Sequence, residues 1–274
     1  MAVVLSVTAS IPPFQLGAMT WFIAFAVMAI YLKCKREKIL PHFNRPVSDY
    51  LFVGMGITLY MLLIYAAFHY SPPFEANTLN YLWPIFLMVF LSIFQGIPLT
   101  LVKWGGLLLG FAGCIILLGF RYGDSQFHGL TIGHISAVLA AIVWALYSCF
   151  AKQRDYPTAF MAPIFLISGV LSFIGHVLWE ETVIPEFSIA FAIFIVGISR
   201  TSYVLWDYAI RQGDRQFITS LSYFIPLVST VLMILFGFGS GNWLVLVAAF
   251  MIVLGCLIIN SDKIAGIFIK KKPA

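Results

Sequence analysis

Arg200 is the residue whose type and position most clearly point to chemistry. It lies near the middle of an apolar run, residues 188–210, that is long enough to cross a membrane. A charged side chain at mid-membrane costs at least about 2.5–3.5 kcal/mol, so this arginine must face protein or water. Its planar guanidinium could bind a carboxylate through two parallel hydrogen bonds. The alternative is a structural arginine that binds backbone carbonyls nearby, and both interpretations stay open.

Asp207 follows in the same run and stands four residues before Arg211. This spacing places an acid and a base next to each other on a helix. We therefore favour a structural ion pair for Asp207 over a proton-coupling carboxylate.

Pro84 and Pro226 interrupt two other apolar runs. A proline within a helix removes one hydrogen bond and frees the carbonyl four residues earlier, here that of Asn80 and that of Ser222. Such backbone is tolerated at membrane depth where protein or a water-filled cavity satisfies it. The two breaks therefore predict a central cavity, and packing kinks are the alternative.

Aromatic and polar side chains near these breaks complete the predicted site. Trp144 and Tyr147 share one face of the run 130–151, where helix packing is the alternative role. Aromatic rings would form stacking walls, and amide and hydroxyl groups would supply polar contacts. The predicted substrate-binding residues are Asn80, Tyr81, Trp83, Pro84, Trp144, Tyr147, Arg200, Tyr203, Ser222, Tyr223 and Pro226.

Motifs for other kinds of chemistry are missing from the sequence. It contains no HExxH, GxSxG or Walker A motif and no CxxC pair. We therefore predict no enzymatic activity, no catalytic residues, no cofactor and no metal site.

The elements that must position the site are membrane-spanning helices. Of the 274 residues, 61% are hydrophobic and only 10% are charged, whereas soluble domains carry about 25% charged residues. A soluble protein is excluded, and the scattered basic residues do not form a surface for nucleic acid. The sequence predicts an all-α membrane protein in a lipid bilayer, with nine helices at residues 14–32, 48–70, 78–95, 102–120, 130–151, 158–179, 188–210, 217–236 and 243–261.

Charge predicts the orientation of these helices. Fourteen of the 16 Lys and Arg residues fall in one alternating set of connections, whereas the opposite set holds only Arg121. The positive-inside rule then places the C-terminus in the cytoplasm and Glu180–Glu186 outside. Nine spans would start the chain outside, so we expect a first helix that is missing or shortened, with residues 1–12 as its remnant.

The sequence also repeats itself. Residues 54–66 align with residues 197–209, with six identities in thirteen positions, and residues 79–84 align with residues 221–226. Five helices separate each segment from its copy, so the two copies cross the membrane in opposite directions. We predict two inverted repeats, residues 1–122 and 123–274, which is a transporter architecture.

These features together resemble the drug/metabolite transporter superfamily, EamA type, and within it the exporters of aromatic amino acids. The resemblance rests on the inverted repeat, on Asn80-Tyr81-Leu82-Trp83-Pro84, on Ile11-Pro12-Pro13-Phe14 and on Trp206-Asp207-Tyr208. It implies a ten-helix bundle of five plus five helices around a central cavity, of which nine complete helices are expected here. Arg200 departs from the family pattern, which has a small or apolar residue at that position.

The resemblance implies a secondary transporter in the bacterial inner membrane that exports amino acids, aromatic or large apolar ones, or related metabolites by alternating access. Its partner would be a small-molecule substrate, and we expect a monomer. One alternative is an exporter of drugs or cationic metabolites, which aromatic walls could serve through cation–π contacts. Another is a membrane scaffold without transport activity, should a shortened first helix abolish transport.

Overall fold

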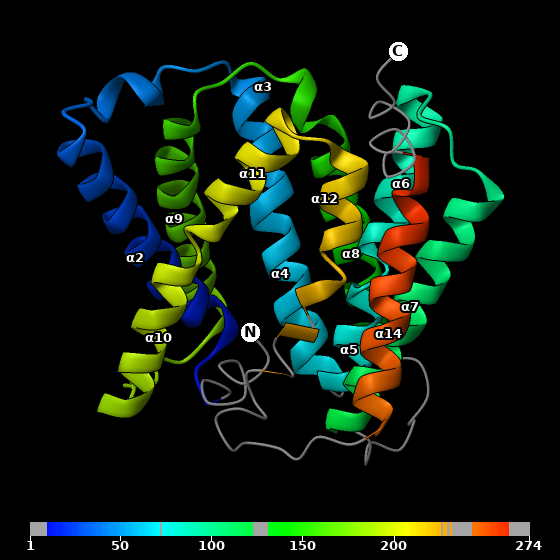
Figure 1. Ribbon diagram of the computed structural model, residues 1–274. Helices are drawn as coiled ribbons and strands as arrows, with labels where there is room; N and C mark the ends of the chain where they lie inside the picture. The colour runs from blue at the N-terminus through cyan, green and yellow to red at the C-terminus, as the bar shows by residue number, and fades with distance from the viewer. Residues whose placement is uncertain are drawn as a thin grey trace.

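The computed structural model describes residues 10–71, 73–122, 131–225, 227–228, 231 and 243–262, and the regular structure within them is helical (Figure 1). The α-helices are α2 (Pro13–Cys34), α3 (Val47–Asp49), α4 (Met55–Tyr70), α5 (Pro73–Asn80), α6 (Trp83–Gln95), α7 (Leu101–Tyr122), α8 (Ile132–Phe150), α9 (Met161–Trp179), α10 (Phe187–Ser199), α11 (Ser202–Gln212), α12 (Arg215–Leu221) and α14 (Trp243–Ile259). Short 3₁₀ segments are η1 (Leu40–Phe43), η3 (Ala151–Gln153) and η4 (Thr158–Phe160), and η2 (Tyr50–Gly54) is a π-helical turn.

The predicted fold class is confirmed, because each expected apolar run contains helix within the described residues. Six helical stretches are long and apolar enough to cross a bilayer by length and composition, and Leu101–Ile116 and Trp243–Ile259 are shorter apolar helices. The expected remnant of a first helix falls mainly on residues 1–9, which lie outside the described residues, as do Pro226 and the basic tail from residue 263.

Two helices are interrupted where the sequence predicts a break. α5 ends at Asn80 and α6 begins at Trp83, with Pro84 in its first turn. Proline is accepted there because a first-turn N–H has no partner within the helix. In the second half, α12 ends at Leu221 and the chain turns at residues 222–223, the positions that the repeat aligns with residues 80–81.

A third interruption was not predicted. The expected span 188–210 is divided at Arg200 and Thr201 into α10 and α11. The N–H of Arg200 is shared between the carbonyls of Val196 (3.1 Å) and Gly197 (3.2 Å), which is the tighter geometry of a helix end. The predicted span is confirmed, because Phe187–Gln212 is long and apolar enough to cross a bilayer, but its helix is interrupted at the charged residue.

Glycines bring the last helix of each half into backbone contact. A Cβ atom added at Gly106 of α7 would lie 2.8 Å from the carbonyl oxygen of Gly255 on α14, and one added at Gly255 would lie 2.6 Å from that of Gly106. A Cβ atom at Gly113 would lie 2.9 Å from the carbonyl oxygen of Ala248. These glycines therefore have a structural role, because only small residues permit so close a crossing.

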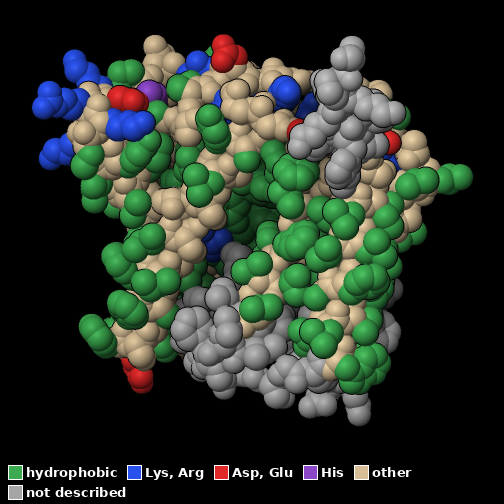
Figure 2. Space-filling model, viewed as in Figure 1, with side chains coloured by type: hydrophobic (Ala, Val, Ile, Leu, Met, Phe, Trp, Pro, Cys, Tyr) green, Lys and Arg blue, Asp and Glu red, His purple; other side chains and the backbone are tan. Residues whose placement is uncertain are grey.

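Charged side chains differ between the two ends of the helices. Figure 2 shows Lys and Arg side chains gathered at the upper left, where α2 ends. The end of α9 and the start of α10, with Glu180 and Glu186 beside them, lie at the opposite end (Figure 1). This separation agrees with the charge pattern of the sequence, and which end faces the cytoplasm stays a prediction.

Candidate functional site

Arg200 is the centre of the candidate site. Its side chain is 1% exposed. One terminal nitrogen faces the sulfur of Met61 at 2.6 Å and the hydroxyl of Tyr203 at 3.5 Å, and the other donates to the hydroxyl of Tyr65. Nε has no hydrogen-bond partner. Within the described part of the chain, no carboxylate forms an ion pair with this guanidinium.

Aromatic faces partly stabilise the charge. The guanidinium carbon of Arg200 lies 5.1 Å from the ring centre of Trp21 and 5.7 Å from that of Tyr65. Both distances fall within the range of cation–π attraction. Rings and hydroxyls carry no net charge, so they do not neutralise the guanidinium. A buried charge without a counter-charge costs free energy, and folded proteins usually pair such charges.

An aromatic cluster extends from the arginine toward α6. The ring centre of Trp144 lies 4.9 Å from that of Tyr60, 5.5 Å from that of Tyr203 and 5.7 Å from that of Trp206. Trp206 in turn meets Trp83 edge to face at 5.2 Å. The cluster joins α4, α6, α8 and α11, so rings from both halves of the chain form one apolar wall.

Asn80 supplies an amide at the edge of this wall. It is the last residue of α5, and its Nδ2 lies 3.4 Å from the hydroxyl of Tyr60. Its Oδ1 is buried and has no hydrogen-bond partner. A buried acceptor without a donor is uncommon in folded proteins, and here it adjoins the same cluster as the uncompensated cation.

Asp207 lies on α11, and both oxygens of its carboxylate accept hydrogen bonds. Its Oδ1 accepts hydrogen bonds from the hydroxyls of Tyr147 and Tyr156, both at 2.6 Å, and its Oδ2 accepts one from Nε of Arg211 at 2.9 Å. Burial and the adjacent carboxylate raise the pKa of Tyr156, so that hydroxyl remains a donor. The predicted ion pair between Asp207 and Arg211 is confirmed.

The structure brings together six of the eleven residues predicted for the site, Arg200 among them. Those linked by side-chain contacts to Arg200 or to the aromatic cluster are Asn80, Trp83, Trp144, Tyr147 and Tyr203. Tyr81 is half-buried at the break between α5 and α6, and Pro84 is buried beside it.

The residues predicted from the second break lie elsewhere. Ser222 donates its hydroxyl to the carbonyl of Thr219 at 2.5 Å. Tyr223 is buried against Gly110 of α7, and its own carbonyl faces the thiol of Cys114 at 3.8 Å. Within the described ranges, the contacts of these two side chains do not reach the Arg200 cluster, and their role in binding stays a prediction.

Sequence reasoning missed five members of the site, namely Trp21, Tyr60, Met61, Tyr65 and Trp206. The repeat contained a signal for one of them, because it aligns Tyr60 with Tyr203, which was predicted.

A cavity of about 660 Å³ approaches Arg200 from the end that holds Glu180. Tyr65 lines this cavity and also accepts the hydrogen bond from Arg200. At the rim, the Glu180 carboxylate accepts hydrogen bonds from the backbone N–H groups of Phe14 and Gln15, at 2.8 and 2.9 Å, which fastens the end of α9 to the start of α2. Tyr65 therefore contacts both the open cavity and the buried cation.

Comparison with known proteins agrees with this architecture. The EamA-like transporter family matches the chain twice, over residues 1–119 and 131–261. The aromatic amino acid exporter YddG of Ancylobacter novellus is 30% identical over 94% of this chain and 91% of its own length. YddG of Escherichia coli K12 is 28% identical over 66% of this chain and 64% of its own, and the uncharacterized inner membrane transporter YedA of the same strain is 25% identical over 81% and 72%.

A solved protein structure superposes on the chain with a TM-score of 0.84 and 29% identity, covering 94% of this chain and 90% of that one. The two family matches fall on the two segments that the internal repeat relates, and the helical arrangement agrees over nearly the whole length. The chain therefore belongs to the EamA-like transporter family of membrane proteins.

Proposed function

We propose that this protein exports aromatic or large apolar amino acids across the inner membrane by alternating access of its two halves. The observation that carries the proposal is Arg200, a buried cation that contacts no carboxylate among the described residues and borders an aromatic cluster. An amino acid with an aromatic side chain would bring the missing anion and a ring that stacks on that cluster. The name of the relative that is 30% identical, an aromatic amino acid exporter, supports the same substrate class.

Each part of such a substrate has a complementary group. The carboxylate would pair with the Arg200 guanidinium, and the hydroxyls of Tyr65 and Tyr203 could donate their protons to it because they meet the arginine as acceptors. The ammonium group would donate to the unpartnered Oδ1 of Asn80. The side chain would lie against Trp144.

Access to the site would follow the cavity that ends at Tyr65. The arginine is closed off in this structure, so a substrate reaches it only after Tyr65 and its neighbours move. With the orientation predicted from charge, this cavity is the external one, and its opening would release the exported molecule.

The test is a comparison of two ligands on one variant. Arg200→Lys keeps the charge but loses the planar fork, so in proteoliposomes transport and binding of phenylalanine should fall, while binding of phenethylamine should not. Arg154→Lys, at the basic end of the molecule, is the matched control and should change neither. Equal loss for both ligands, or no loss for either, would exclude a carboxylate role for Arg200.

Two alternatives are separated by the same assay. Tighter binding of phenethylamine or of a quaternary ammonium compound than of phenylalanine in the unmodified protein would indicate an exporter of cations. An absence of transport with any of these compounds, in liposomes that hold folded protein, would indicate a scaffold.

Orientation has its own test. A cysteine introduced at Glu181 should react with a membrane-impermeant maleimide in intact cells, since the positive-inside rule places it outside. Labelling only after lysis would reverse the proposed direction of the cavity.

A further inference from the structure

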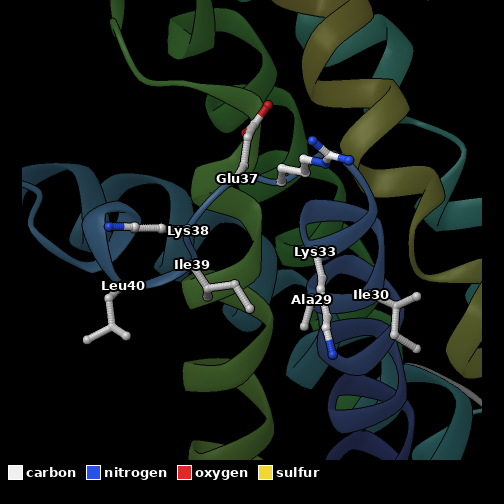
Figure 3. Close-up of a pocket in the computed structure, with 8 residues that line it drawn as sticks. Ala29, Ile30, Lys33, Glu37, Lys38, Ile39 and Leu40 are labelled. Atoms are coloured by element: carbon white, nitrogen blue, oxygen red, sulfur yellow. The ribbon is translucent and has the colours of Figure 1, made fainter.

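A second cavity lies at the basic end of the molecule, far along α2 from the Tyr65 cavity. It measures about 570 Å³ and opens between the last turns of α2 and the segment that leads into η1 (Figure 3). Its walls combine three basic side chains with apolar ones that are exposed or partly buried. The basic residues are Lys33, Arg36 and Lys38, and the apolar ones include Ile30, Ile39 and Leu40.

The two kinds of side chain are separated in space. In Figure 3, Ile39 and Leu40 point back along the direction of α2, and Lys33 extends down the same helix beside Ala29. Leu40 is 83% exposed and Ile30 is 63% exposed, so both apolar surfaces are open beside the helices. Glu37 points away from them in the same view.

The basic side chains of the cavity lack anionic partners. Among the described residues, Lys33, Arg36 and Lys38 take part in no ion pair. All three are exposed. Three unpaired cations above exposed apolar side chains form a surface that matches an anion carrying apolar chains.

A tight backbone turn builds this arrangement. Arg36 has φ 59°, and the N–H groups of Arg36 and Glu37 bond to the carbonyls of Lys33 (3.0 Å) and Leu32 (2.9 Å). This is the helix-ending motif in which glycine is preferred at the left-handed position. The turn redirects the chain so that Lys38 and Leu40 line the same cavity as Lys33 and Ile30, and the cavity is therefore part of the fold.

We propose that this cavity binds an anionic phospholipid of the adjacent leaflet. Its phosphate would lie among Lys33, Arg36 and Lys38, and its acyl chains would pack on Ile30, Ile39 and Leu40. Basic residues next to a membrane helix attract anionic lipids. Long basic side chains cover apolar surface with their methylene groups while their charged ends stay at the headgroups.

The position of the cavity gives a bound lipid a route to the central site. It sits at the end of α2, and the middle of the same helix carries Trp21, which packs on Arg200. α2 also packs along α9 and α10. A lipid held at this end would restrain the helix that covers one side of the arginine.

Native mass spectrometry of the full chain tests the proposal without any assumption about transport. The protein is titrated with phosphatidylglycerol and with phosphatidylcholine of the same acyl chains. Phosphatidylglycerol should bind selectively, and Lys33→Gln/Lys38→Gln should weaken its binding about 25-fold, since each basic residue near an anionic headgroup contributes roughly fivefold. Lys33→Arg/Lys38→Arg should retain binding, which separates loss of charge from misfolding.

The matched control removes the same charge outside the cavity. Lys35 lies 5.0 Å from the ring centre of Tyr31, and Lys152 is exposed on η3. Lys35→Gln/Lys152→Gln should therefore bind phosphatidylglycerol normally. Equal weakening in both glutamine variants would show general attraction by charge and overturn the site, as would equal binding of phosphatidylcholine. Glycerol phosphate that competes as well as the whole lipid would overturn the role of the apolar wall.

Discussion

Two buried arginines lie eleven residues apart, Arg200 at the break between α10 and α11 and Arg211 on α11, and their surroundings are opposite. Arg211 donates to the Asp207 carboxylate and to the carbonyl of Tyr156 at 2.7 Å, and its guanidinium carbon lies 4.2 Å from the Tyr156 ring centre. Arg200 has aromatic rings, two hydroxyls and a sulfur, but no carboxylate among the described residues. The protein therefore supplies a carboxylate to Arg211, whereas none of the described carboxylates pairs with Arg200.

This difference in pairing suggests different roles for the two arginines, one in stability and one in ligand binding. A buried ion pair whose hydrogen bonds are filled holds helices together, and removing one partner leaves the other charge buried alone. A buried cation without an anion costs free energy in the empty state, and a ligand recovers that cost. We infer that the Asp207 network stabilises the fold and that Arg200 binds an anionic group of the substrate.

The largest effect should come from breaking the completed pair. Asp207→Asn leaves Arg211 without its carboxylate and should destabilise the protein by about 3–5 kcal/mol. The melting temperature of the purified protein measures this loss. A melting temperature close to that of the unmodified protein would show that the Asp207 network does not stabilise the fold.

The incomplete site should respond in the opposite way. Arg200→Gln removes an uncompensated charge, so stability should stay the same or rise. Phenylalanine affinity should fall about 10- to 100-fold, as expected for hydrogen bonds to a charged group. Calorimetric binding and a melting curve on the same sample measure both quantities. A drop in melting temperature as large as that of Asp207→Asn would show that Arg200 stabilises the fold as Arg211 does.

Tyr65→Phe should reduce phenylalanine affinity less than Arg200→Gln does. Losing one hydroxyl should weaken phenylalanine binding about fivefold. Tyr208→Phe is the control, because the repeat aligns Tyr208 with Tyr65 and its side chain is largely exposed. Equal effects of the two substitutions would place the binding determinant elsewhere.

The corresponding change in the scaffold is Tyr156→Phe, which removes one of two hydroxyls from Asp207. We expect a loss of about 1 kcal/mol in stability and unchanged phenylalanine affinity. A loss of affinity without a loss of stability would mean that the Asp207 network takes part in binding.

The sequence predicted the elements of the fold better than the details of the site. Hydropathy predicted the helices, and Pro84 predicted the break after α5. These features follow from local chain chemistry. Asp207 and Arg211 could also be paired from sequence, since they are four residues apart on one helix.

Contacts between distant segments could not be predicted in the same way. Tyr156 reaches Asp207 from a loop 51 residues away, and Trp21 meets Arg200 from another helix. Helix rotation decides which faces meet, and an apolar sequence without strong amphipathic pattern does not specify it. The break at Arg200 also lacks a proline that would have predicted it.

The glycine contact between α7 and α14 has a consequence for how the protein is made. Gly255 is synthesised 149 residues after Gly106. At roughly 5–20 residues per second, translation needs on the order of ten seconds to cover that distance. During this interval α14 is absent, so the glycine face of α7 must be accommodated in the bilayer before the helix that covers it is made.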